Sequence, residues 1–347
     1  MVFWDRCLNI TSPYSIPLGV KEHSIAIPAP QGQWVRRIIP LLKFWRKSLR
    51  TLRHIRPDVI HCGNLDMLSV AHSYKRLVDP DVKLVYEMAD LPKVIYNTNR
   101  DLKSRTLRAL FHTIEKALCK RIALLVITSP YFWDDYYSSF IPKNKVLFLA
   151  NVPEQGLFSH YSKAPHDGFT IGFIGLIRYP DQIEMLIDAT ENIEGVRVLV
   201  AGSGSSYEEI RDYCAKKEHV LFYGPYDYQK DIIFLYSQID CVYSVYDTAY
   251  DNVRVALPNK LYEAIVCELP IIVANNTTLG RFVIEHGIGF AVSDRDTLGL
   301  RNLIVKLIAQ PQLLDETGVR LRELRPSYSA EAGYDMLRQS YRQLENP

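Results

Sequence analysis

Hydrophobic residues in the second half of the chain form short continuous runs that alternate with segments of helical periodicity. Five runs rich in β-branched and aromatic residues predict strands over residues 170–175, 196–202, 219–224, 240–245 and 270–274. The segments between them predict helices near 181–193, 206–217, 229–238 and 259–268. Such alternation is typical of a parallel sheet covered on both faces. Right-handed crossovers then predict a doubly wound α/β domain.

The first half follows the same pattern. Its predicted strands cover residues 2–4, 23–27, 56–62, 83–87, 123–128 and 145–149, and its predicted helices lie near 41–55, 66–78, 103–121 and 131–139. We therefore expect an N-terminal Rossmann-like domain over residues 1–154, a linker over 155–168 and a C-terminal Rossmann-like domain over 169–328.

The overall composition is that of a globular protein, with 48% hydrophobic and 23% charged residues in 347. No run approaches 18 uncharged apolar residues and the N-terminus has no signal pattern, so we expect no transmembrane helix and a cytoplasmic location. The six cysteines are scattered and form no zinc-binding spacing. They predict buried free thiols and no metal site.

Charge is divided unevenly along the chain. Residues 1–150 hold 23 Lys/Arg against 12 Asp/Glu, whereas the remainder holds 18 against 27. Eight basic and no acidic residues fall within 33–56, and the apolar residues there share one helical face: Ile38, Leu41, Leu42, Trp45, Leu49 and Leu52. A basic amphipathic helix over 36–56 suits an anionic membrane surface. Equally, the apolar face packs on its own sheet while the charges stay solvated. Nucleic acid fits less well, because the rest of the chain is acidic.

The most informative motif is the segment from Leu257 to Ala264. Pro258 suits the first helical position, Asn259 suits a cap, and the free N–H groups of the helix start favour a phosphate, to which Lys260 adds a positive charge. Glu263 lies about one turn further on, where a carboxylate suits the diol of a ribose. The pattern predicts a clamp for a nucleoside diphosphate. A surface helix with an ordinary Lys/Glu pair is the alternative.

Three further strand ends carry candidate binding residues. Gly175 ends one strand and Arg178 follows in the loop, where a guanidinium reaches a diphosphate. Gly202 and Gly204 follow the next strand, without the third glycine of a dinucleotide fingerprint. Tyr226 follows a third strand and suits a nucleobase. Each motif alone also fits an ordinary loop, but their convergence on one sheet edge predicts a binding crevice.

These motifs resemble the donor domain of family-4 retaining glycosyltransferases, which have the GT-B fold of two Rossmann-like domains. The matching segments are 173–178, 200–204, 223–224, 235–240, 258–263 and 285–289, with acceptor-domain matches at 56–61, 84–91, 126–130 and 151–153. The resemblance implies that residues 1–154 form the acceptor side and 169–328 the donor domain. It also implies that a helix over 329–347 returns to the first domain.

The chain departs from the family pattern at several positions. Val255 stands where the first glutamate of Glu-x7-Glu is expected, and the usual loop lysine is replaced within Pro180-Asp181-Gln182. Met88-Ala89-Asp90 stands where the family tends to place a histidine, which makes Asp90 a candidate near the acceptor hydroxyl. The start, Met1–Arg6, matches the family's second strand, so we expect about one β-α unit to be missing.

The resemblance implies transfer of a hexose from a nucleotide-diphosphate sugar, and UDP is the commonest nucleotide in the family. Glu263 would bind the ribose, and Arg178 and Lys260 would stabilise the leaving diphosphate without metal or cofactor. The further residues expected to bind the nucleotide sugar are Gly175, Gly204, Tyr226, Pro258, Asn259 and Leu261. The expected acceptor is a lipid-linked or cell-surface saccharide at the cytoplasmic membrane face. The alternatives are a nucleotide-sugar epimerase of the same fold, an inactive nucleotide-sugar-binding scaffold and, least favoured, a dehydrogenase.

Overall fold

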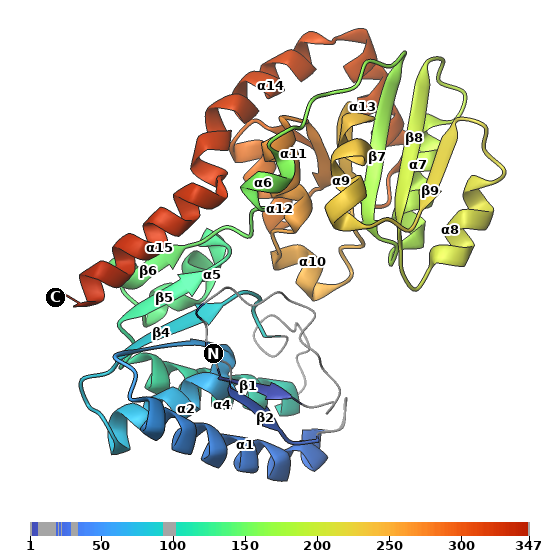
Figure 1. The fold of residues 1–347 in the computed structure, drawn as a ribbon. Coiled ribbons are helices and arrows are strands. Elements are labelled where there is room, and N and C mark those ends of the chain that lie inside the picture. The colour runs from blue at the N-terminus through green and yellow to red at the C-terminus, as the bar shows by residue number, and fades with distance from the viewer. Residues whose placement is uncertain are drawn as a thin grey trace. The chain divides into compact units, whose positions relative to one another are not determined.

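The computed structural model describes residues 2–5, 19, 21, 23–28, 34–92 and 102–345 (Figure 1). The chain divides into two compact units. The first consists of Met1–Ala89, Thr106–Ile127 and Tyr137–Leu147, and the second of Asp90–Arg105, Thr128–Tyr136 and Phe148–Pro347. The domain boundaries at residues 154 and 169, and the return of the last helix, stay predictions.

The second unit contains a six-stranded sheet in the order β12-β11-β10-β7-β8-β9, in which all neighbouring strands are parallel. Its strands are β7 (Phe169–Leu176), β8 (Val196–Ser203), β9 (Val220–Gly224), β10 (Cys241–Ser244), β11 (Ile271–Ala274) and β12 (Gly289–Val292). The chain order reverses at β7, since β8 lies on one side of it and β10 on the other. Such a switch point is where doubly wound sheets bind ligands.

Helices cover both faces of this sheet. They are α7 (Pro180–Thr190), α8 (Tyr207–Cys214), α9 (Tyr228–Ser237), α10 (Asp251–Val255), α11 (Asn259–Cys267), α12 (Thr278–Glu285), α13 (Thr297–Ala309) and α14 (Gln312–Leu324). The unit also includes α5 (Pro130–Asp135), α6 (Gln155–Phe158) and, after a 3-10 turn at Arg325–Tyr328, α15 (Ala330–Glu345).

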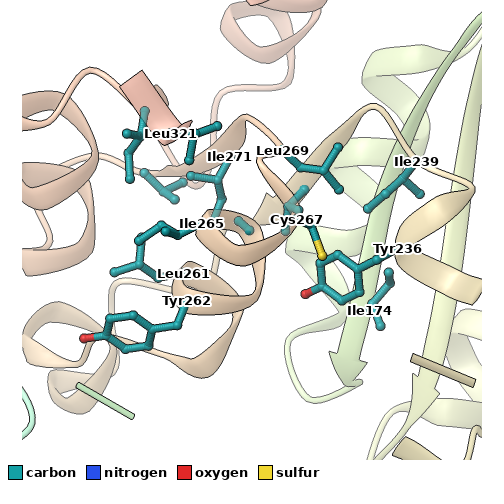
Figure 2. Packing of buried hydrophobic residues seen from close by; sticks show 14 of the residues in the cluster. Ile174, Tyr236, Ile239, Leu261, Tyr262, Ile265, Cys267, Leu269, Ile271 and Leu321 are labelled. Carbon is teal, nitrogen blue, oxygen red and sulfur yellow. The ribbon is translucent and has the colours of Figure 1, made fainter. Parts of the chain in front are cut away.

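Alternate strand residues pack into two separate cores. Val242, Ile271 and Val273 belong to a core with α9, α11 and α12, whereas Cys241, Tyr243 and Ile272 belong to a core with α7, α8 and α13. Figure 2 shows part of the first core, where Leu261 and Ile265 of α11 lie among other buried side chains. Burial on both faces explains why these strands have continuous apolar sequences.

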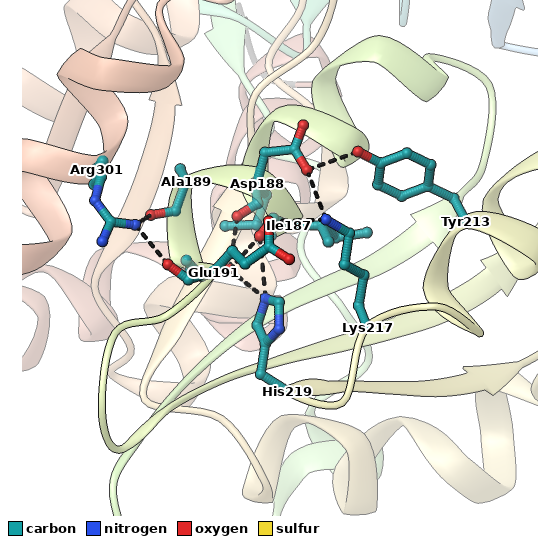
Figure 3. A network of polar contacts seen from close by, with 10 residues as sticks. Ile187, Asp188, Ala189, Glu191, Tyr213, Lys217, His219 and Arg301 are labelled. Atoms are coloured by element: carbon teal, nitrogen blue, oxygen red, sulfur yellow. Dashed lines mark hydrogen bonds and ion pairs between the residues drawn. The ribbon is translucent and has the colours of Figure 1, made fainter.

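The end of α7 is fixed by polar contacts from α13 and from the loop between α8 and β9 (Figure 3). Arg301 donates hydrogen bonds to the carbonyl oxygens of Ala189 (3.1 Å) and Glu191 (2.7 Å), and Lys217 forms an ion pair with Glu191 at 2.9 Å. The Nε2 atom of His219 lies 3.1 Å from the carbonyl oxygen of Ile187. These contacts satisfy carbonyl groups that a helix end leaves unpaired.

The first unit contains two sheets. The larger has the order β3-β4-β5-β6 and consists of β3 (Val59–Gly63), β4 (Lys83–Met88), β5 (Leu124–Ile127) and β6 (Val146–Phe148), whose last residue falls in the second unit. The smaller pairs β1 (Val2–Asp5) with β2 (His23–Ala26) in parallel. The helices are α1 (Trp34–Ile55), α2 (Asn64–Leu77) and α4 (Leu102–Cys119), with 3-10 turns at Tyr137–Ser139 and Lys143–Lys145.

The predicted apolar face of α1 is partly wrong. Phe44, which is not on the predicted apolar face, is buried with Ile25 of β2 and Ile27, which follows that strand. Leu42 of the predicted face is 58% exposed. Phe44 and Ser48 are one turn apart and define the buried side, whereas Ile38 and Leu42 lie on other sides of the helix. The side chains of Arg36 and Arg37 lie outside the described residues, as does Cys7.

The five cysteines among the described residues are free and buried, as the sequence predicts. Within the same residues, no helix combines the length and the hydrophobicity that crossing a bilayer requires. No cluster of His, Cys, Asp or Glu in the described chain has the geometry to hold a metal ion.

Candidate functional site

The first turn of α11 begins without a side-chain cap. The prediction that Pro258 opens the helix and Asn259 caps it is wrong by one residue. Pro258 has an extended ψ of 158° and is itself the cap residue, and no side chain caps the helix. Asn259 is instead the first helical residue, and its Oδ1 accepts a hydrogen bond of 2.7 Å from Asn151. Uncapped N–H groups at a helix start favour an anionic ligand.

Lys260 and Glu263 form a close ion pair on the adjoining turn. The Nζ atom of Lys260 lies 2.8 Å from Oε2 of Glu263, and the two side chains are 13% and 1% exposed. Two tyrosines of α9 complete the environment of the carboxylate. Tyr236 donates to Oε2 at 2.5 Å and Tyr228 donates to Oε1 at 3.0 Å. A buried carboxylate is therefore balanced by one cation and two hydroxyl donors.

The two tyrosines keep their protons. Burial first, and the charge of Glu263 second, raise the pKa of Tyr228 and of Tyr236 above the ordinary value for tyrosine. The same two causes raise the pKa of Tyr226 to about 12. All three hydroxyls therefore remain hydrogen-bond donors at neutral pH. Sequence analysis missed Tyr228 and Tyr236, although Tyr236 lies within a segment that matches the family motifs.

The end of β7 lies directly beneath Lys260. A Cβ atom placed on Gly175 would lie 2.9 Å from Cε of Lys260, so the lysine side chain passes close to the backbone of the strand end. Arg178, three residues further on, lines a pocket of about 180 Å³ together with Pro258, the cap residue of α11. The structure thus brings Gly175, Arg178, Pro258, Lys260 and Glu263 together around the carboxyl end of β7 and the start of α11.

The pocket beside Arg178 is mainly apolar and aromatic. It lies at the carboxyl ends of β7, β10 and β11, and Tyr179 at its wall packs against Tyr246 and Tyr250 with ring centroids 5.7 and 5.3 Å apart. Its apolar and aromatic lining consists of Leu176, Tyr179, Tyr246, Val253, Ala256, Ala274, Pro258 and Leu279. A few polar groups, among them Asn252 and Ser244, complete the wall. A mostly apolar wall with few polar groups is typical of small-molecule pockets.

The remaining candidates occupy different environments. Gly204 follows β8, where a Cβ would lie 2.1 Å from the carbonyl oxygen of Ile177, so close loop packing already requires glycine there. Tyr226 follows β9 and is half-buried. Leu261 is fully buried in the core and its amide donates to the carbonyl oxygen of Pro258. Asp90 is exposed and lies two residues after the end of β4. Their roles stay predictions.

The chain is similar to known proteins both within the second unit and over most of its length. Residues 168–310 match the family model described as Glycosyl transferases group 1. Over 323 residues the chain is 26% identical to the succinoglycan biosynthesis protein ExoL of Rhizobium meliloti (strain 1021), covering 89% of this chain and 78% of that protein.

Two solved structures show the similarity of the fold. HepE of Anabaena in complex with UDP has a TM-score of 0.67 at 15% identity, covering 94% of this chain and 86% of HepE. HepE has also been solved with UDP-glucose. Sucrose-phosphate synthase from Thermosynechococcus elongatus has a TM-score of 0.66 at 19% identity, covering 92% of this chain and 83% of the synthase. The two parallel α/β sheets together with these neighbours confirm the predicted GT-B architecture.

Proposed function

Since residues 168–310 match the family model described as Glycosyl transferases group 1 and the chain has the GT-B fold, we propose that the protein moves a hexose from a UDP-sugar to an acceptor hydroxyl with retained configuration. The observation that carries the proposal is the position of Lys260. Its side chain crosses the end of β7 at the uncapped start of α11, next to the pocket that Arg178 lines. Two cations and free amides at a sheet switch point suit a diphosphate.

The strand order suggests how the donor lies along the sheet edge. The base would stack near Tyr226 after β9, and the ribose would meet Glu263. The diphosphate would lie at β7 between Lys260 and Arg178, and the sugar would enter the apolar pocket at β10 and β11. When the bond between the anomeric carbon and the diphosphate breaks, negative charge grows on the departing oxygen. Lys260 and Arg178 would stabilise that charge.

Binding of the ribose requires two changes around Glu263. Its carboxylate is 1% exposed and already accepts from three donors. Tyr228 is the less buried of the two tyrosines. We therefore propose that its hydroxyl moves away when the donor arrives, and that Lys260 turns from Glu263 towards the diphosphate.

The acceptor that we propose is a lipid-linked or cell-surface polysaccharide precursor. Support comes from the similarity to ExoL, whose name places it in succinoglycan biosynthesis, and from the basic helix α1. A cytoplasmic membrane face is the corresponding location. Asp90 remains the candidate near the acceptor hydroxyl, and Asp90→Asn tests it through the rate of transfer at saturating donor.

The decisive experiment measures turnover of UDP-sugars by the purified protein with a membrane extract as acceptor source. We expect Lys260→Ala and Arg178→Ala each to lower the rate by roughly 10²–10³-fold, the usual cost of removing one stabilising donor at a developing charge. Arg211→Ala is the matched control, because Arg211 pairs with Glu208 and Asp212 on the exposed side of α8. UDP at 100 times its dissociation constant should also stabilise the fold by ~2.7 kcal/mol.

Other outcomes would identify the alternatives. Release of an epimeric nucleotide sugar without any acceptor would indicate an epimerase. Binding of UDP without turnover of any donor would indicate a nucleotide-sugar-binding scaffold, with which the replacement of a family glutamate by Val255 is consistent. No UDP binding and equal behaviour of Lys260→Ala and Arg211→Ala would refute the proposal.

A further inference from the structure

We propose that a polar groove at the start of α12 binds a neutral saccharide, namely the sugar end of the acceptor; this inference rests on the proposed transfer reaction. The groove has a volume of about 600 Å³ and is lined by residues of α10, α12 and the end of β11. Thr277 lines both this groove and the pocket beside Arg178. A molecule lying in the groove would therefore present a hydroxyl group to whatever fills the pocket.

The charged side chains of the groove are balanced and fixed by neighbours. Arg281 stacks 3.7 Å from the ring centroid of Tyr131, whose hydroxyl donates to Glu285 at 2.7 Å. Arg254 pairs with Asp251 and donates to the carbonyl oxygen of Thr248 at 3.1 Å. Such groups lose little conformational freedom when a ligand binds.

The balance of charge indicates what kind of ligand fits. Arg254 and Arg281 are matched in the lining by Asp135 and Glu285. A phosphate or pyrophosphate group would meet two carboxylates as well as two guanidinium groups, so the groove offers it no net attraction. A lipid chain would take these charged groups out of water without offering them any hydrogen bond, which is costly. An uncharged polyol has neither disadvantage.

Two adjacent asparagines add the donors and acceptors that sugar hydroxyls require. Asn275 and Asn276 both line the groove, and Nδ2 of Asn276 lies 3.3 Å from Oδ1 of Asn275. An amide side chain both donates and accepts, as a hydroxyl group does. Ile284 lies on the same wall and is 57% exposed, which gives the apolar face of a sugar ring a surface to cover.

The left-handed backbone of Asn276 allows a clean test. Its φ is +55°, a conformation that glycine adopts without strain, so Asn276→Gly removes the amide and keeps the turn. Asn192 has a φ of +57° and is likewise exposed, at the end of α7 outside the groove. Asn192→Gly is therefore the matched control. Ile284→Arg provides a second variant, which obstructs the groove and disturbs its charge balance.

The measurement is saturation-transfer NMR in the presence of UDP, with n-octyl β-D-glucopyranoside, n-octyl β-D-galactopyranoside and octyl phosphate as probes. We expect at least one glycoside to bind and octyl phosphate not to bind. Asn276→Gly should weaken the affinity for the glycoside by about two- to tenfold, which corresponds to the net loss of one neutral hydrogen bond. Ile284→Arg should abolish binding, and Asn192→Gly should leave it unchanged.

The result separates this inference from the proposed function. Stabilisation by UDP, measured on the same samples, reports the donor site alone. If UDP binds but neither glycoside does, or if Asn276→Gly and Ile284→Arg bind glycoside like the parent, the groove is not the acceptor subsite. Preferential binding of octyl phosphate would likewise overturn the assignment to a neutral saccharide.

Discussion

At the scale of single residues, Glu263 is the group on which the site depends. A carboxylate that is 1% exposed is stable only when its charge is compensated. Lys260 supplies the opposite charge, while Tyr236 and Tyr228 supply hydrogen bonds. The same arrangement holds the carboxylate in one orientation.

Tyr236 should therefore matter for stability as well as for ligand binding. Tyr236 is fully buried, and Tyr236→Phe removes a hydrogen bond to a charged acceptor without leaving a cavity. We expect the free energy of unfolding to fall by about 2 kcal/mol in chemical denaturation, within the range for such bonds. Tyr228→Phe should cost less stability, because Tyr228 is only partly buried. Equal effects of the two variants would contradict the account of Glu263.

The sequence predicts only part of this residue network. Lys260 and Glu263 are three residues apart on one helix, and this spacing alone predicts that they share a side. Tyr228 and Tyr236 lie 35 and 27 residues away from Glu263 on another helix. Their contact depends on how α9 and α11 pack in one core, which periodicity does not specify. Periodicity also does not specify the exact residue at which a helix begins. The observed positions of Pro258 and Asn259 at the helix start therefore differ by one residue from the predicted ones.

At the scale of elements, helix α7 is well anchored at its end but carries several acidic side chains close to one another. Asp181, Glu184 and Asp188 follow one another at helical spacing, and Glu209 of α8 acts on Glu184 as well. Burial is the largest cause that raises the pKa of Glu184 above its ordinary value, and the charges of Glu209, Asp181 and Asp188 raise it further. The folded state therefore holds the proton of Glu184 more tightly than the unfolded chain does.

This shift has a defined consequence for stability. An acid whose pKa is raised on folding costs stability above that pKa, and the cost disappears below the pKa of the unfolded chain. We expect Glu184→Gln to raise the free energy of unfolding at pH 7 by a few tenths of a kcal/mol, the size of effect typical of partly exposed charges. The melting temperature should rise slightly with it. The gain should vanish near pH 4. A gain that is equal at both pH values, in calorimetry, would have another cause than the charge of Glu184.

Strands were easier to predict than helix faces. Every predicted strand is present, because a run such as Ile271–Ala274 is buried on both faces and keeps a continuous apolar sequence. The elements that were not predicted are the strand β12 and the helices α6, α10, α12, α13 and α14. In α1 the polar Ser48 is buried and the apolar Leu42 is exposed, so burial there follows the position of the neighbouring sheet rather than hydrophobicity.

At the scale of the whole molecule, the uneven charge along the sequence gives the two halves different surfaces. The basic excess of the first 150 residues concentrates in α1, whose outer side carries Arg46 and Arg50. Ile39 and Leu42 lie on the same side and are 65% and 58% exposed. Cations next to exposed apolar side chains are the combination with which helices lie on anionic membrane surfaces.

We therefore expect the protein to sediment with vesicles that contain 30% phosphatidylglycerol and not with vesicles of phosphatidylcholine alone. Each cation near such a surface contributes about 1 kcal/mol, so the double variant Arg46→Glu, Arg50→Glu should lower the partition coefficient by roughly tenfold or more. Binding should also weaken as salt rises, because exposed charges are screened. The control is Arg211→Glu on α8 of the second unit, which removes an exposed arginine away from α1. If the control loses as much binding as the double variant, net charge rather than α1 holds the protein at the vesicle.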